Sequence, residues 1–157
     1  MATFAGTFRP RLGKMIDTSP PVVWTLPIEA AQVFVADEFV YRSGGYVVTC
    51  ADEPGTVLGL AKEAAPQADG EVEVLIATAM TAFILCVHDT TVDTSIIDAA
   101  DMGVATYSLV HLAGSGLWYI NKNGTGAEIT IQQFVDAVGT TYGRVLATIV
   151  PGTREVA

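Results

Sequence analysis

The fold class is decided by residues 71–88, which read EVEVLIATAMTAFILCVH. Acidic and apolar residues alternate from Glu71 to Val74, as in a strand with one wet face and one packed face. Residues 74–88 contain no Asp, Glu, Lys or Arg, but they include two threonines and a histidine. The run is also shorter than the ~20 apolar residues that a membrane-spanning helix needs. We therefore expect two buried strands here.

The same strand-like pattern continues outward from this stretch, beginning at residue 29. Short β-branched and aromatic runs are bounded by glycine, proline and aspartate about every ten residues. Gly44-Gly45 and Asn123-Gly124 have the composition of hairpin turns, and 94–101 is the best candidate for a short helix. The expected strands are 32–36, 38–42, 46–50, 57–61, 71–77, 82–88, 105–112, 117–121, 128–134 and 144–150. The sequence thus predicts an all-β fold, a compact antiparallel β-barrel or β-sandwich of the β-tulip or jelly-roll kind.

Length and charge distribution predict one domain with an appended arm. The chain has 157 residues, of which 50% are hydrophobic and 16% are charged, so a real core is expected. Residues 1–28 carry a formal charge of +2 and four of the seven prolines, whereas residues 29–157 carry −11. Proline removes the backbone donor that a helix interior or a central strand needs. We expect an extended N-terminal arm over 1–28 and a β-domain over 29–157.

Net charge, targeting signals and cysteine content argue against several classes of protein. A net charge of −9 has the wrong sign for neutralising phosphates, so direct nucleic-acid binding is not expected. Residues 1–14 lack a continuous apolar segment, so we expect neither a secretory signal nor a membrane anchor. Cys50 and Cys86 are too few for a disulfide scaffold and lack the spacing of a zinc site. Both are expected in buried strands, and a bridge between them stays open.

The search for catalytic or metal-binding motifs favours structural interpretations. His88 with Asp89 and Asp93 resembles part of a metal site but lacks a third ligand at a recognisable spacing. Ser115 follows His111 closely, but its surroundings lack the first glycine of a nucleophile elbow. The glycine-containing run 55–62 does not have the spacing of a phosphate-binding loop. We therefore expect no enzyme, no metal and no cofactor.

Several segments together resemble one known family. They read VFVADEFVY (33–41), GGYVV (44–48), DEPGTVLGLA (52–61), MGVATYSLV (102–110), GLWYIN (116–121) and YGRVLA (142–147). In order and wording they are similar to the capsid decoration (cement) proteins of tailed bacteriophages, and the similarity spans most of residues 30–150.

This resemblance implies a structural virion protein. It would bind the outer surface of an icosahedral phage head, with the major capsid protein as partner, and stabilise the joints between capsomers. The family often forms homotrimers. Synthesis in the host bacterial cytoplasm and no contact with membrane are expected.

Residues 1–28 lie outside the resemblance and are the predicted docking element. Apolar side chains of this arm would anchor in grooves, and its basic side chains would pair with acidic surface on the capsid or on a neighbouring subunit. A loose terminus without a role is the alternative. The predicted docking residues are Phe4, Phe8, Arg9, Arg11, Leu12, Lys14 and Met15.

Two other classes of function remain open at this point. A small β-barrel enzyme or ligand-binding protein could have a pocket without recognisable motifs. A surface carbohydrate-binding module would need exposed aromatic side chains, for which Trp24, Trp118 and Tyr119 are candidates.

Overall fold

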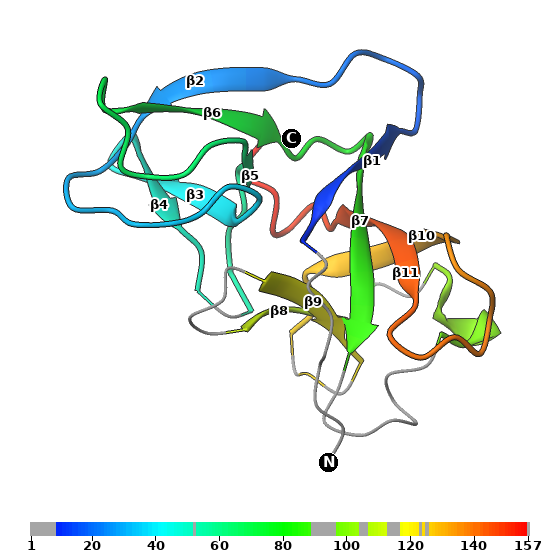
Figure 1. Cartoon of the computed structure of the whole chain (residues 1–157). Coiled ribbons are helices and arrows are strands. Elements are labelled where there is room, and N and C mark those ends of the chain that lie inside the picture. The colour runs from blue at the N-terminus through cyan, green and yellow to red at the C-terminus, as the bar shows by residue number, and fades with distance from the viewer. Residues whose placement is uncertain are drawn as a thin grey trace.

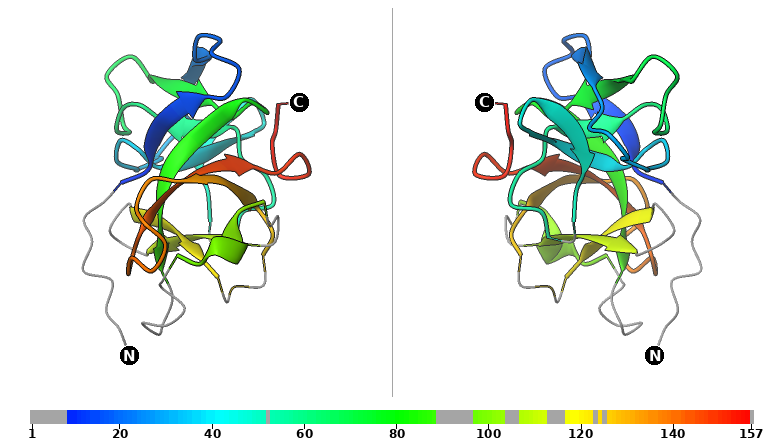
Figure 2. Two further views of the ribbon diagram at one scale, coloured as in Figure 1. Left: turned by 90° about the vertical axis from the view of Figure 1, so that its right-hand side faces the viewer. Right: turned by 90° about the vertical axis from the view of Figure 1, so that its left-hand side faces the viewer.

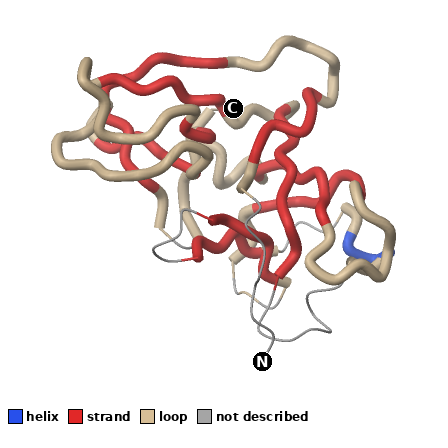
Figure 3. Tube along the Cα trace, in the orientation of Figure 1, coloured by secondary structure: helices blue, strands red, loops and turns tan. Residues whose placement is uncertain are grey.

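The computed structural model is all-β. It describes residues 9–51, 53–88, 97–103, 107–112, 117–122, 124 and 126–156, without the side chain of Leu112. Within these ranges the one helical element is a short 3-10 helix, η2 (Ala99–Asp101), and no helix could cross a membrane (Figure 3). The strands are β1 (Arg11–Met15), β2 (Val23–Pro27), β3 (Phe39–Ser43), β4 (Tyr46–Thr49), β5 (Gly59–Ala61), β6 (Glu71–Ile76), β7 (Thr81–His88), β8 (Ser108–Leu112), β9 (Leu117–Asn121), β10 (Ile129–Phe134) and β11 (Arg144–Ile149).

The strands form two sheets in a sandwich-like arrangement (Figures 1 and 2). One sheet has the order β10-β11-β7-β9-β8, and β1 also pairs with β7; the other has the order β2-β6-β5-β3-β4. All strand pairs are antiparallel except the short parallel contact between β7 and β9. Both sheets curl, because Tyr107 bridges to Ile129 and Ile28 bridges to Val47 across their outer strands. Neither sheet forms a closed barrel, so the sandwich alternative of the sequence prediction is the one that fits.

The stretch 71–88 supplies an interior strand to each sheet. β6 lies between β2 and β5, and β7 lies between β11 and the two strands β1 and β9. Seven of the eight residues of β7 are buried, and the main core cluster includes Phe83, Leu85 and Val87. The prediction of two buried strands is confirmed.

Aromatic contacts connect the two sheets through the core. Phe39 begins β3, and its ring meets Phe83 of β7 edge to face with centroids 5.3 Å apart. Phe39 meets Trp118 of β9 in the same way at 5.4 Å. All three side chains are fully buried, and such pairs contribute about 1 kcal/mol each beyond the burial of their area.

The prediction that residues 1–28 form an arm outside the domain is wrong for residues 11–15 and 23–27. β1 pairs with residues 81–84 of β7, and β2 pairs with residues 71–75 of β6. The prolines do not prevent this, because Pro20 and Pro21 lie in the β1–β2 connection and Pro27 ends an edge strand, where a missing donor is tolerated. The predicted boundary between residues 28 and 29 therefore falls inside the folded domain, because strands before it pair with strands after it.

Most other predicted elements agree with the structure to within a few residues. The strand expected at 32–36 is an exception, since only Phe34 makes an isolated bridge there. Gly44 and Gly45 form the β3–β4 hairpin turn with φ of 59° and 88°, as predicted. Asn123 of the hairpin expected at Asn123-Gly124 lies outside the described residues, and the flanking strands β9 and β10 are not neighbours in the sheet, so they do not form that hairpin. The predicted helix 94–101 is reduced to η2 in its described part, and its residues 94–96 lie outside the described ranges.

Gly59 provides a test of how closely β5 and β6 approach. A Cβ on Gly59 would overlap the carbonyl oxygen of Leu75 and lie 2.8 Å from its carbonyl carbon. Because backbone atoms of a buried strand cannot move aside cheaply, Gly59→Ala is expected to lower the free energy of unfolding by about 2–3 kcal/mol. The measurement is the urea unfolding midpoint. Gly55→Ala is the control, because no heavy atom lies within 4 Å of its Cβ position. Equal midpoints for the two variants would contradict the close approach.

Candidate interaction surface

The predicted docking residues lie mainly on β1 rather than on a free arm. Met15 is only 9% exposed, and Leu12 packs against the main core cluster, so both are used within their own subunit. Lys14 donates from Nζ to Gln133 Oε1 at 2.9 Å, and Arg9 donates from Nη1 to the carbonyl of Ala36 at 3.5 Å. These four residues therefore lie in the folded domain rather than in an extended arm. Of the other predicted residues, Arg11 lies on β1, and Phe4 and Phe8 lie outside the described residues.

A largely apolar groove lies between β1 and the second sheet. Its volume is about 390 Å³, and its charged side chains are Arg11, Asp37 and Lys62. The apolar lining consists of Leu12, Pro21, Val23, Leu60 and Leu75. Burial raises the pKa of Asp37 above its usual value, and the nearby charge of Arg9 opposes that shift. We call this hollow the β1 groove.

Exposed apolar side chains also occur on the connections that follow β1 and β6. Ile16, Val22 and Met80 are 43%, 37% and 39% exposed. The amide of Ile16 donates to the carbonyl of Met80 at 2.8 Å, and the carbonyl of Val22 accepts from the amide of Ile76 at 2.8 Å. The β1–β2 and β6–β7 connections that carry these side chains lie together at the top of Figure 1. We call Ile16, Val22 and Met80 the end patch.

A second hollow lies beside Cys50. It has a volume of about 320 Å³ and is lined by Tyr41, Thr49, Cys50, Ala51, Pro54, Gly55 and Thr56. Burial is the main reason that the pKa of the Cys50 thiol lies far above its usual value, so the sulfur is held as an unreactive thiol. Burial also raises the pKa of Cys86 to about 11. Both cysteines are free and buried, so no disulfide bond joins them.

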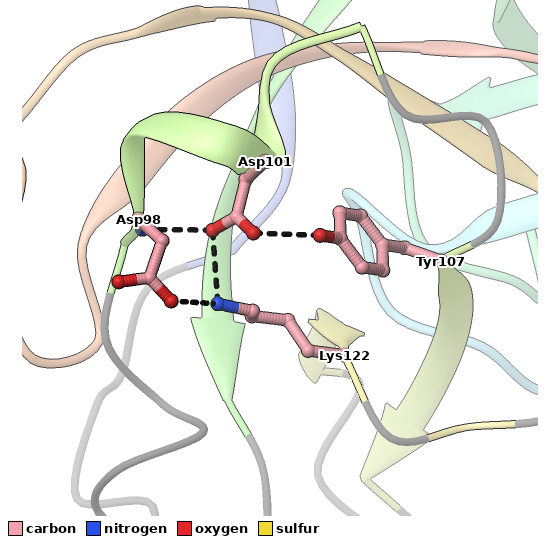
Figure 4. Close-up of polar contacts among 4 residues, drawn as sticks. All are labelled: Asp98, Asp101, Tyr107 and Lys122. Atoms are coloured by element: carbon pink, nitrogen blue, oxygen red, sulfur yellow. Dashed lines mark hydrogen bonds and ion pairs between the residues drawn. The ribbon is translucent and has the colours of Figure 1, made fainter.

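A buried carboxylate joins η2 to the two strands β8 and β9 (Figure 4). Asp101 Oδ1 accepts from the Tyr107 hydroxyl at 2.6 Å, and Oδ2 accepts from the Asp98 amide at 2.8 Å. Lys122 Nζ lies 3.0 Å from Asp101 Oδ2 and 2.9 Å from Asp98 Oδ2. Burial opposes the charge of Lys122, but its hydrogen bonds to the two aspartates hold its pKa above the usual value. Every partner is engaged within the fold, so the cluster reads as a structural brace.

A second polar cluster contains two glutamates. Glu53, whose φ of 47° is in the left-handed region, accepts at Oε1 from Ser108 Oγ at 2.8 Å and from the Gly126 amide at 3.2 Å. Glu128 accepts at Oε2 from the Leu109 amide at 3.0 Å and is 6% exposed. Burial is the largest cause that raises the pKa of Glu128, the Leu109 amide opposes it, and the charge of Glu53 adds to it. The pair ties the β4–β5 connection to β8 and β10.

The two histidines pack against aromatic side chains within the domain. The ring of His111 stacks on Trp118 at 4.7 Å, and its Nε2 lies 3.0 Å from Oε1 of the buried Glu38. His88 is buried against Tyr119 and Tyr142. Ser115, Asp89 and Asp93 lie outside the described residues. Across the residues that are described, no group of three or more His, Cys, Asp or Glu could hold a metal ion.

The aromatic residues considered for carbohydrate binding do not form an exposed platform. Trp118 is fully buried and Tyr119 is 9% exposed. Trp24 packs against the second core cluster and carries the guanidinium of Arg42 at 5.6 Å from its ring centroid. These three residues therefore do not support the carbohydrate-binding alternative.

The β1 groove and the end patch were not predicted from the sequence. Their residues come from segments near positions 12, 22, 60 and 75, which only the pairing of β1 with β7 and of β2 with β6 brings together. The run from Val22 to Leu26 has strand-like composition and was the available signal for β2. No family model, no curated protein and no solved structure matches the chain.

The raised pKa of Glu128 predicts a distinctive pH dependence of stability. The folded protein holds this proton more tightly than the unfolded chain, so the group destabilises the fold once it ionises. Its contribution is most favourable below the ordinary glutamate pKa of ~4.3 and is lost as pH rises through the raised value. Glu128→Gln removes this ionisation. Relative to the wild type, the variant is expected to gain urea resistance as pH rises above ~4.3 through the raised pKa of Glu128.

The matched control is Glu29→Gln, because the Glu29 side chain is exposed. Unfolding of all three proteins is followed over the same pH series. A difference between wild type and Glu128→Gln that is independent of pH would contradict the assignment.

Proposed function

We propose that the protein is a decoration protein of a tailed-bacteriophage head, which binds the outer surface of the shell and stabilises the joints between capsomers. The observation that carries this proposal is the end patch beside the β1 groove, where Ile16, Val22 and Met80 expose apolar surface. Exposed apolar side chains on neighbouring connections favour contact with another protein. The resemblance of residues 30–150 to decoration proteins supplies the kind of partner, the major capsid protein.

The charge of the chain supports the outer rather than the inner surface of a head. With a net charge of −9, the protein is repelled by packaged nucleic acid and gains nothing from phosphate contacts. A protein that binds the assembled shell and not its dispersed subunits stabilises the shell by mass action. Many copies on one lattice add weak contacts into a large total effect. We further propose a homotrimer, whose number of subunits comes from the resemblance alone.

Purified heads with and without the protein test this function directly. Heads that carry it are expected to release their contents at a higher temperature and to resist osmotic shock and chelation better. The measurement is the disruption temperature by light scattering and electron microscopy of the same samples. If bare and decorated heads are equally robust, the stabilising function is wrong. If the protein does not bind heads at all, the whole proposal fails.

The end patch gives a residue-level version of this test. Met80 lies in the β6–β7 connection, so Met80→Asp places a charge on the end patch without entering the core. Occupancy on heads is expected to fall about tenfold at subsaturating protein. Val138→Asp is the control, because Val138 is 54% exposed on the β10–β11 connection. Equal loss of binding in both variants would show that the end patch is not the docking surface.

A further inference from the structure

The β1 groove has the geometry of a site for an additional strand. β1 pairs with β7 along one edge, and no described strand pairs with its other edge. Leu12 of β1 lines the groove together with Val23, Leu60 and Leu75 from the other sheet. An extended peptide that adds to an open strand edge gains main-chain hydrogen bonds and places alternate side chains in the adjoining hollow. The groove therefore fits an extended, apolar segment.

The size and chemistry of the β1 groove define its occupant further. An apolar cavity of about 150 Å³ accepts a benzene ring, so a groove of about 390 Å³ has room for two aromatic side chains. Its floor is aliphatic, and the charged side chains of Arg11, Asp37 and Lys62 include both signs. The matching segment is thus uncharged, extended and equipped with two aromatic residues on one face.

Residues 1–8 of this chain have that composition. They read MATFAGTF, without a charged side chain, and precede the described residues. In an extended strand Phe4 and Phe8 point to the same face, because side chains alternate with a period of two. Eight extended residues span ~26 Å at ~3.3 Å each, which is more than the ~17 Å of a five-residue strand such as β1.

The start of the described chain indicates that the occupant comes from a second copy. To return along its own β1, the chain would have to reverse at Arg9 and Pro10. Because Arg11 already belongs to β1, this reversal would place Arg9 and Pro10 at the two central positions of a turn, and proline is disfavoured at the second central position of a type I turn. Pro10 is also buried, and the Arg9 side chain is bonded to the carbonyl of Ala36. A return of the chain along its own β1 is therefore disfavoured.

We infer that residues 1–8 of one subunit add as a strand to β1 of a second subunit and place Phe4 and Phe8 in its β1 groove. Such an exchange is head to tail, and it forms a closed ring when the rotation between subunits permits. It supplies a physical basis for self-association in solution. It does not depend on the proposed binding to phage heads, because the purified chain contains both the segment and the groove.

Disulfide trapping between two different variants tests the exchange. One protein carries Phe4→Cys and the other carries Val23→Cys, which lies in the groove and is 40% exposed in the wild type. The native thiols of Cys50 and Cys86 are buried and do not compete. Mixed under mild oxidation, the two variants are expected to form a covalent heterodimer. Phe4→Cys mixed with Val138→Cys is the matched control and is expected to give no such product.

Sedimentation equilibrium gives the second readout. Phe4→Ser combined with Phe8→Ser is expected to weaken self-association by about tenfold or more, and Val23→Asp is expected to do the same. Val138→Asp is expected to leave it unchanged. A wild-type monomer at about 100 µM, unchanged association of the Phe4 and Phe8 variant, or equal cross-linking to both cysteine positions would overturn the inference. So would a chain carrying both Phe4→Cys and Val23→Cys that forms its disulfide within a monomer.

Discussion

The ring of Phe39 occupies the position on which both sheets depend. It belongs to β3 of one sheet and meets Phe83 and Trp118 of the other, at 5.3 Å and 5.4 Å, with all three side chains fully buried. Because aromatic side chains bury ~150–250 Å² each, this contact concentrates a large apolar burial between the sheets. The carboxylate of Glu38, the residue before Phe39, lies 3.0 Å from His111, which stacks on Trp118. One short segment thus places an apolar contact against β7 and β9 and a polar contact against β8 of the same sheet.

Two buried carboxylate clusters also fix connections against the strands. Asp101 accepts hydrogen bonds from Asp98 and Tyr107 and pairs with Lys122. Glu53 accepts hydrogen bonds from Ser108 and Gly126. Burying a charge is costly unless hydrogen bonds compensate it, so these clusters sit where connections must be fixed against strands. They explain why histidines and acidic residues that look chemically suggestive in the sequence are engaged in holding the domain together.

The sequence predicted strands well where the pattern of side chains is local. The alternation at Glu71–Val74 and the apolar run that follows identify β6 and β7, because period and burial are both encoded in adjacent residues. Proline content predicts an arm where β1 and β2 form, although the run from Val22 to Leu26 has strand-like composition. Proline is compatible with a strand at an edge, and edge position is a property of the whole sheet that local sequence does not carry. The β1 groove could not be predicted from local sequence for a related reason. Its lining brings Leu12 and Val23 together with Leu60 and Leu75, which are far away in the sequence.

The placement of the chain ends has a consequence for synthesis. β1 can pair only after residues 81–84 have left the ribosome, and Val57 receives its partners only when Thr153 and Glu155 emerge, through hydrogen bonds of 2.8 Å and 2.9 Å. Arg42 likewise waits for Glu155 to complete its ion pair. Long-range pairing of this kind makes folding slow compared with helical domains of the same size. β1, β2 and Val57 therefore remain incompletely paired until their later partners emerge, and these apolar segments must be shielded from neighbouring chains during that interval.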